Sequence, residues 1–303
     1  MSNTTASLRR QIDSAADLQA VVRTMKALAA SSIGQYEQSV QALADYDRTV
    51  ELALGACLRR MGPMPSGAPK LKPAAATMVS AVVFGSDQGL VGRFNEAVAD
   101  HAVASLAALA KPGSAPKSHS APRVWAVGER VHSRLTDAGV QPVGRFAVPT
   151  SIGGIVPLIG QILTESQRHG GHGMNAELHL FYNSPATGST FASVGQKLLP
   201  LDEDWRRSRA EIKWPAQHLP EVIGGAATLG PLIGEYLFVS LFRACAESLA
   251  SENASRLAAM QRADKNIDEV LATLRGDFHR LRQSRIDEEL FDVISGFEAL
   301  NRQ

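Results

Sequence analysis

The stretch Leu8-Arg-Arg-Gln-Ile-Asp-Ser-Ala-Ala-Asp-Leu-Gln-Ala-Val-Val-Arg-Thr-Met25 carries apolar residues at alternating steps of three and four. The pattern continues to Cys57 without a proline, which predicts a helix with a stripe close to the coiled-coil period. Such a helix of about 55 residues would be about 80 Å long, so much of it must pack on a partner. The stripe consists of Leu8, Ile12, Ala15, Leu18, Val22, Met25, Ala29, Ile33, Tyr36, Val40, Leu43, Tyr46, Val50, Leu54 and Cys57.

The C-terminal part of the chain repeats this pattern. Apolar residues recur at steps of four and three from Met260 to Leu281, and after a change of phase the stripe resumes from Ile286 to Leu300. A change of this kind alters the supercoil locally. Two narrow apolar stripes cannot both stay in water, so we expect the N- and C-terminal helices to form a long antiparallel coiled coil.

The middle of the chain reads as an α/β domain. The run Thr77-Met-Val-Ser-Ala-Val-Val-Phe84 is nearly continuous in apolar residues and suits a strand buried on both faces. Further strands and helices alternate after it, which favours a parallel-type sheet. The further strands are expected at 123–127, 142–147, 177–182 and 191–199, and the helices at 95–109, 128–138 and 155–166. From Leu201 to Pro220 the pattern fades.

The predicted fold class is therefore α/β plus a long antiparallel coiled coil of the terminal helices. The predicted divisions are a long N-terminal helix at 1–60, a Pro/Gly/Ala/Lys-rich linker at 61–76, a Rossmann-like α/β domain at 77–220 and a long C-terminal helix at 221–303.

Composition narrows the function classes. Hydrophobic residues make up 45% of the 303 residues, which excludes wholesale disorder. The formal charge of +1 argues against nucleic acid as the main partner. Cys57 and Cys245 are far apart and form no metal-binding pair, and the polar N-terminus predicts no secretory signal. No uncharged apolar run approaches the ~20 residues of a membrane span.

Candidate chemistry is sparse. The loop Gly85-Ser-Asp-Gln-Gly-Leu-Val-Gly92 joins a strand to a helix, but its glycines fit neither the dinucleotide nor the P-loop pattern, so a tight turn is preferred over a nucleotide site. His169 and His172 lack matching ligands, so the segment from Arg168 to Gly173 is expected to be a connecting loop rather than a metal site. The sequence shows no catalytic set, and no cofactor or metal is expected.

Three segments carry a resemblance to a known family. They are Leu8–Ser14 with Met25–Ser31; Ser86-Asp-Gln-Gly-Leu-Val-Gly-Arg-Phe-Asn95; and Glu252–Met260 with Asn266, Arg282-Gln-Ser-Arg-Ile-Asp-Glu-Glu-Leu290 and Gly296–Leu300. Together they resemble the gamma subunit of F-type ATP synthases, the rotating central shaft, over essentially the whole chain. Gln88, Val91, Arg93 and Asp287 depart from the usual residues, which indicates a diverged or alternative bacterial form.

The resemblance implies that catalysis occurs on surrounding alpha and beta subunits. The coiled coil would fill the axis of their hexamer, and rotation would couple ion translocation through the membrane ring to ATP synthesis or hydrolysis. The base domain would lie with the epsilon subunit and the ring of c subunits, at the cytoplasmic face of the bacterial inner membrane. The alternative is a stand-alone α/β enzyme or binding module that dimerises through its helices.

The resemblance also implies contact residues. Arg282 and Gln283 match positions that grip the catalytic subunits, and the end of the chain, which includes Ile286 and Leu290, would sit in an apolar sleeve. In the N-terminal helix, Met25 and Lys26 match the segment that faces the moving lever of the catalytic subunit. The base-domain motif, represented by Asp87, Gly89 and Asn95, is expected to have structural roles.

Overall fold

The computed structural model describes residues 4–61, 79–109, 122–170, 177–187, 189–201, 203–216, 218 and 220–301. The chain divides into two compact units: unit 1 comprises Met1–Ala29 and Arg256–Gln303, and unit 2 comprises Ala30–Ser255. The two longest helices, α1 (Thr5–Met61) and α6 (Leu229–Asn301), each contribute residues to both units. The predicted linker at 61–76 lies outside the described residues except for Met61, which ends α1.

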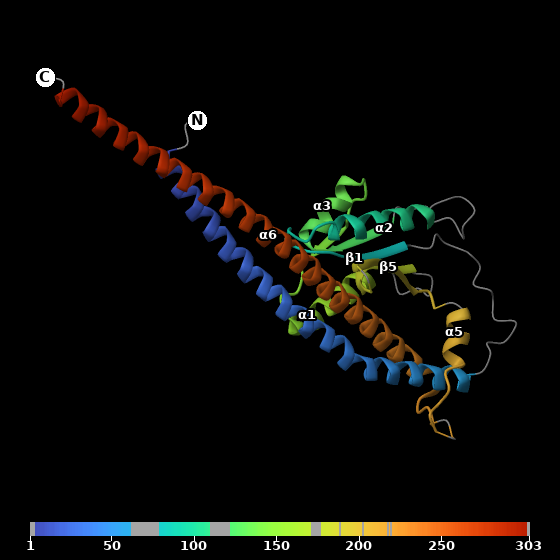
Figure 1. The fold of residues 1–303 in the computed structure, drawn as a ribbon. Coiled ribbons are helices and arrows are strands. Elements are labelled where there is room, and N and C mark those ends of the chain that lie inside the picture. Colours follow the sequence, from blue (N-terminus) through green and yellow to red (C-terminus); the bar gives the residue numbers. More distant parts are fainter. Residues whose placement is uncertain are drawn as a thin grey trace. The chain divides into compact units, whose positions relative to one another are not determined.

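Unit 1 is an antiparallel pair formed by the first part of α1 and the last part of α6 (Figure 1). Thr5 lies next to Arg285, whereas Lys26, further along α1, contacts Asp264, earlier in α6. The seam buries Leu8, Val22 and Ala29 of α1 and Met260 and Leu271 of α6. The predicted antiparallel pairing of the terminal helices is confirmed.

Two residues of the predicted N-terminal stripe, Leu18 and Tyr46, are exposed, so their predicted burial is wrong. Leu18 is 55% exposed, and its neighbour Gln19 occupies the buried position with 9% exposure. Gln19 tolerates burial because its Nε2 donates hydrogen bonds to Asp264 and Asp268 of α6. The stripe therefore contains a polar residue where the apolar pattern placed a leucine.

The predicted change of phase near Leu281 does not interrupt α6, which continues as one α-helix to Asn301. Because α1 begins at Thr5 and Thr5 already lies beside Arg285, the residues of α6 after Arg285 extend past the end of α1 within unit 1. Their apolar side chains therefore have no described α1 residue to pack on.

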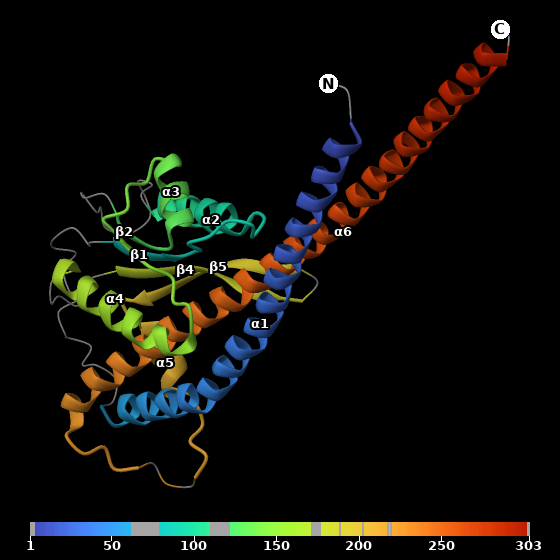
Figure 2. The same ribbon diagram turned by 90° about the vertical axis from the view of Figure 1, so that its left-hand side faces the viewer.

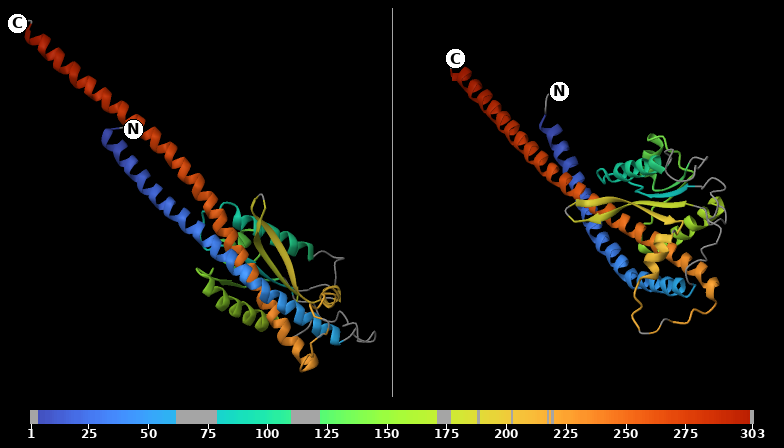
Figure 3. Two further views of the ribbon diagram at one scale, coloured as in Figure 1. Left: turned by 60° about the horizontal axis from the view of Figure 1, so that its bottom comes forward. Right: turned by 90° about the vertical axis from the view of Figure 1, so that its right-hand side faces the viewer.

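Unit 2 contains a five-stranded sheet in the order β3-β2-β1-β4-β5. The strands are β1 (Val79–Phe84), β2 (Arg123–Val127), β3 (Gly144–Phe146), β4 (Glu177–Ala186) and β5 (Ser189–Leu199). The first four pair in parallel, as predicted, but β5 pairs antiparallel with β4 (Figure 3). Only two residues separate β4 from β5, and a connection that short permits a hairpin but no parallel crossover.

Helices cover both faces of this sheet, so β1 is buried on both faces as its apolar run predicted (Figure 2). Ala81 and Val83 of β1 face the cluster containing α2 (Phe94–Leu109) and α3 (Glu129–Asp137). Val82 and Phe84 face the opposite cluster, which contains α4 (Ile155–Gly170) and residues of α1 and α6 that belong to unit 2. Two short 3-10 helices, Ile152–Gly154 and Gly225–Thr228, precede α4 and α6.

Two stretches are helical where no helix was predicted. Helix α5 (Glu203–Ala210) forms within the segment where the pattern fades, and Trp205 anchors it by an edge-on contact with Tyr236 of α6, with ring centroids 5.2 Å apart. Helix α4 continues to Gly170, so Arg168 and His169 end a helix rather than open a loop, while 171–176 lie outside the described residues.

Helix α6 contains one window that is apolar and long enough to cross a membrane by length and composition, and nearly half of that window is buried inside the protein. In unit 2 its residues Leu241, Phe242 and Cys245 belong to the main core cluster. Packing against the sheet therefore accounts for the apolar character of this part of the helix.

Candidate functional site

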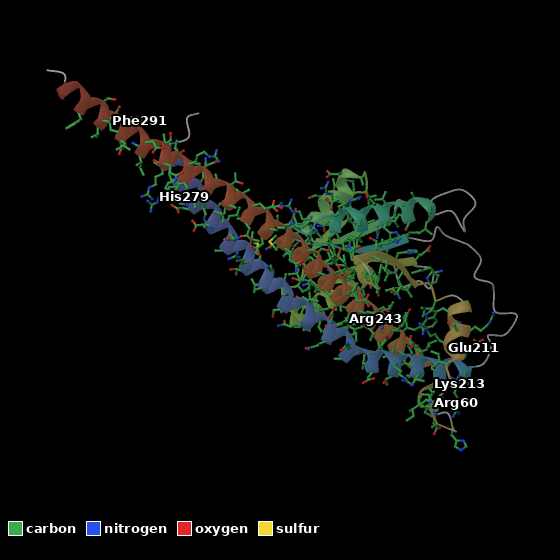
Figure 4. The ribbon with its side chains drawn as sticks, in the orientation of Figure 1. Arg60, Glu211, Lys213, Arg243, His279 and Phe291 are labelled. Atoms are coloured by element: carbon green, nitrogen blue, oxygen red, sulfur yellow. The ribbon has the colours of Figure 1, made fainter. Side chains whose placement is uncertain are left out.

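The end of α6 carries the largest set of exposed apolar side chains among the described residues. The set comprises Ile286 (53% exposed), Leu290 (56%), Phe291 (68%), Val293 (70%), Ile294 (46%) and Phe297 (66%). Figure 4 shows Phe291 on this part of α6. Exposed clusters of large apolar residues mark surfaces that bind another molecule. Arg282 and Gln283, also predicted as contacts, are exposed one turn earlier on the same helix.

A polar cluster joins α1 to α6 inside unit 1. Asp264 accepts hydrogen bonds from Lys26 Nζ at 3.0 Å and from Arg23 Nε at 3.2 Å. Gln19 Nε2 donates to Asp264 Oδ1 at 3.3 Å and to Asp268 Oδ1 at 2.5 Å. The hydrogen bond from Lys26, followed by the one from Arg23, holds the pKa of Asp264 below its usual value. Lys26 is therefore half-buried and paired within the chain.

Helix α1 also exposes a row of apolar residues that the sequence analysis did not predict as a contact surface. Leu18, Val21 and Leu28 are 55%, 52% and 64% exposed, and their spacing of three and seven residues places them on one face with the half-buried Met25. The signal was present as a second apolar row beside the main stripe. This row extends the predicted contact at Met25 along α1.

The turn after β1 is held by its own side chains. Asn95 Oδ1 accepts the backbone N–H of Ser86 at 2.9 Å, and Asn95 Nδ2 donates to Ser86 Oγ at 2.8 Å. Asp87 accepts the backbone N–H groups of Glu129 and Val148, each at 2.9 Å. The backbone N–H groups of Gly85 and Ser86 are thus already bonded, to the Val127 carbonyl and to Asn95, so they are not free to hold a phosphate, which favours the tight-turn interpretation.

The same turn contains two residues in the left-handed backbone region. Leu90 and Gly92 adopt positive φ values of 64° and 60°. Gly89 is half-buried, and a Cβ there would meet only the guanidinium of Arg130 at 3.8 Å. Next to the turn, Asn183 of β4 donates to the carbonyl of Phe94 at 2.8 Å and accepts from Ser193 of β5 at 2.7 Å. The motif residues Asp87 and Asn95 therefore fasten the turn and the start of α2 to the sheet.

The candidate reactive side chains do not assemble into a catalytic set in the described parts of the chain. Burial raises the pKa of the Cys57 thiol and raises that of Cys245 to about 12, so neither thiol is a ready nucleophile. His179 pairs with Glu177 at 2.9 Å on the same strand. Across the described ranges, no group of three or more His, Cys, Asp or Glu side chains could hold a metal ion, while His172 lies outside them.

The family model for ATP synthase matches residues 4–300 of this sequence. The chain belongs to the ATP synthase gamma family. Its relatives include the ATP synthase gamma chains of Salinibacter ruber, 26% identical over 310 residues with 97% of each chain covered, and of Syntrophus aciditrophicus, 24% identical over 294 residues with 97% of each covered.

Solved structures show the same fold as this gamma subunit. One is the rotor of the Euglena gracilis mitochondrial ATP synthase, with a TM-score of 0.59, 15% identity and coverage of 93% of this chain and 98% of that one. Another is the central stalk and c-ring of the Tetrahymena thermophila enzyme, with a TM-score of 0.54, 18% identity and coverage of 80% and 99%. The predicted fold class and the predicted identity as the gamma subunit of the central stalk are confirmed.

Proposed function

We propose that this gamma subunit is the turning shaft of a bacterial rotary ATP synthase and has no catalytic site of its own. The observation that carries the proposal is the exposed apolar end of α6, from Ile286 to Phe297, which extends past α1 within unit 1. Fully burying a side chain such as Leu or Phe lowers the free energy by about 1.5–3 kcal/mol relative to leaving it in water. Binding of this apolar end to a partner is therefore favourable.

The partner is the sleeve formed by the alpha and beta subunits. Dispersed apolar contacts suit a bearing, because they change little as the shaft turns, whereas strong directional bonds would hold one angle. Next to this end, Arg282 and Gln283 form polar contacts with the catalytic subunits. On α1, Met25 and its apolar neighbours form a second contact with the same subunits. Lys26 acts through Asp264, to which it is paired.

Rotation is coupled to catalysis because the shaft contacts the catalytic subunits unequally. A shaft that contacts the three catalytic subunits differently favours a different conformation in each, and turning the shaft exchanges those conformations. A shaft with equal affinity for all conformations would shift nothing. The proposal therefore needs an asymmetric surface, and the α1–α6 pair of unit 1 supplies one because its two helices end at different levels.

The α/β part of unit 2 is the base of the shaft. In this proposal it contacts the epsilon subunit and the ring of c subunits at the cytoplasmic face of the bacterial inner membrane. Asp87 and Asn95 support that base by fixing the turn after β1, in which Gly89 also lies. Solved Euglena gracilis assemblies of similar fold contain F1 and the c-ring, which supports these partners.

Affinity purification from native membranes tests the proposal. A tag on the N-terminus, which leaves the apolar end of α6 unchanged, should recover alpha, beta, epsilon and c subunits in mild detergent together with ATPase activity. The purified chain alone should hydrolyse no ATP. Recovery without alpha and beta subunits, or turnover by the isolated chain that survives further purification, would refute the proposal.

A further inference from the structure

A cavity of about 470 Å³ lies between α1, α5 and α6 in unit 2. Figure 4 labels Arg243 on α6 and Lys213 just after α5, which belong to its wall. We name it the α5 pocket. Its charged lining residues are Asp47, Arg48, Glu51, Arg209, Lys213 and Arg243.

The charges of the α5 pocket do not cancel. Both carboxylates already have partners, since Asp47 pairs with Arg243 at 3.2 Å and Glu51 pairs with Arg209. Arg243 also lies 3.5 Å from Glu247, which does not line the pocket. Four cations thus face two carboxylates, and the pocket has a surplus of two positive charges.

Arg48 and Lys213 supply this surplus. Both are exposed, and neither forms an ion pair with any residue in the described ranges. Unpaired cations at the mouth of a pocket attract anions and can form charge-assisted hydrogen bonds to them without first breaking an internal pair.

Arg209 adds a donor held in place. Its guanidinium pairs with Glu51 and lies over the Trp205 ring, 5.7 Å from the ring centroid. Its Nε is buried and has no acceptor in the described structure. A buried donor without an acceptor is unfavourable, so an oxyanion that reaches this guanidinium would relieve the penalty.

We propose that the α5 pocket binds the phosphate groups of a small soluble compound, such as pyrophosphate or the polyphosphate of a nucleotide. Arginine matches phosphate oxygens with paired hydrogen bonds, and the volume lies within the usual range of about 300–1,000 Å³ for ligand pockets. The size favours a polyphosphate over a single small ion. A phospholipid headgroup presents the same chemistry, so the test must separate the two sources.

Isothermal titration of the full chain with pyrophosphate tests the proposal. The substitutions Arg48→Gln and Lys213→Gln, made together, should weaken binding at least about tenfold, because each replaces a cation with a neutral amide and so removes a charge-assisted hydrogen bond to the anion. Neither residue forms an ion pair with another described residue, so the fold should persist, and Lys213→Gln alone serves if the double variant fails to fold. Arg130→Gln, at an exposed arginine of α3 that has no ion pair within the described part of the chain, is the matched control and should bind as the unsubstituted chain does.

Binding should weaken as salt increases, because the attracting charges are exposed. No heat of binding at millimolar pyrophosphate, or equal binding by the double variant, would overturn the proposal.

Sedimentation with phosphatidylglycerol vesicles is the second experiment, which tests whether the ligand is a lipid headgroup. Vesicle binding that needs Arg48 and Lys213 but is unaffected by pyrophosphate would assign the pocket to a lipid and would also overturn it. Either failure leaves the shaft function untouched, because that function is tested by subunit recovery.

Discussion

Asp264 gathers the charged contacts between α1 and α6 in unit 1, since Gln19, Arg23 and Lys26 all reach it. Asp264→Asn should lower the melting temperature at pH 7, by the small amount typical of exposed ion pairs, because Arg23 and Lys26 lose their counterion. Melting followed by circular dichroism measures this effect. Asp292→Asn, at an exposed position of α6 with no ion pair to another described residue, should leave the melting temperature unchanged.

The contribution of Asp264 depends on pH in a defined direction. Its pKa is lowered in the folded chain, chiefly by Lys26. The stabilisation is therefore fully present above the pKa of about 3.9 of an unfolded aspartate and is lost as the pH falls through the lower folded value. The difference between the variant and the unsubstituted chain should stay constant from neutral pH to about pH 5 and shrink below it. A difference that grows on acidification would contradict this assignment.

Asn95 is a second residue whose removal has a calculable cost. Asn95→Ala would leave the buried N–H of Ser86 without its acceptor, which corresponds to about 1–3 kcal/mol in the free energy of unfolding. Urea denaturation measures the loss. Gln88→Ala, at an exposed position of the same turn, is the control and should change stability little. Equal stability of the two variants would show that the turn is held by other contacts.

Residue-level prediction from the sequence succeeded where apolar spacing decides the outcome and failed where polar pairing does. Leu8, Val22 and Ala29 are buried as expected. Gln19 is buried although its side chain is polar, because Asp264 and Asp268 lie 245 and 249 positions away in the sequence and satisfy it. No pattern local to α1 contains that information.

Among the elements, the two glycines Gly276 and Gly55 should respond in opposite ways to alanine. A Cβ at Gly276 of α6 would meet nothing within 4 Å, so Gly276→Ala should stabilise the chain by about 0.5–1 kcal/mol through helix propensity. A Cβ at Gly55 of α1 would lie 2.6 Å from the carbonyl oxygen of Arg209, so Gly55→Ala should destabilise the chain by about 1–3 kcal/mol by forcing α5 away.

Urea denaturation of the two glycine variants serves as the measurement, and each variant is the other's control because both lie in long helices. Stabilisation by Gly55→Ala would mean that α5 does not pack closely on α1. In that case the walls of the α5 pocket would also need revision, since Arg209 belongs to both contacts.

For helices and strands, prediction from the sequence again succeeded where the pattern within the element decides the structure. It failed where contacts with residues far away in the sequence decide it. The buried run of β1 and the long helices were visible because periodicity is a local property. Helix α5 was not, since eight residues without an apolar stripe give no periodic signal and Trp205 gains its partner, Tyr236, only through the tertiary fold. The antiparallel direction of β5 follows from a two-residue connection, which the predicted strands at 177–182 and 191–199 did not show because both strands extend further toward each other in the structure.

For the whole molecule, apolar periodicity predicts that a helix has a partner but not which molecule supplies it. The stripe from Met260 to Leu281 belongs to the part of α6 that pairs with α1, whereas Ile286, Leu290 and Phe297 continue the periodicity and stay exposed. The difference arises because α1 begins at Thr5, opposite Arg285. The candidate contact surface is thus the part of a helical pattern that the chain itself leaves uncovered.

Deletion of residues 286–303 should therefore weaken assembly and coupling more than it lowers basal ATP hydrolysis. Loss of even one well-buried apolar side chain corresponds to about a tenfold change in an equilibrium, and the deletion removes the six exposed ones named above together with Leu300. The ratio of ATP synthesis to hydrolysis in reconstituted vesicles measures coupling. The full-length double substitution Glu288→Gln and Glu289→Gln, which changes exposed polar residues of the same segment, should keep that ratio. A truncated shaft that couples as well as the intact one would place the working contacts before Ile286, on Arg282, Gln283 and the exposed row of α1.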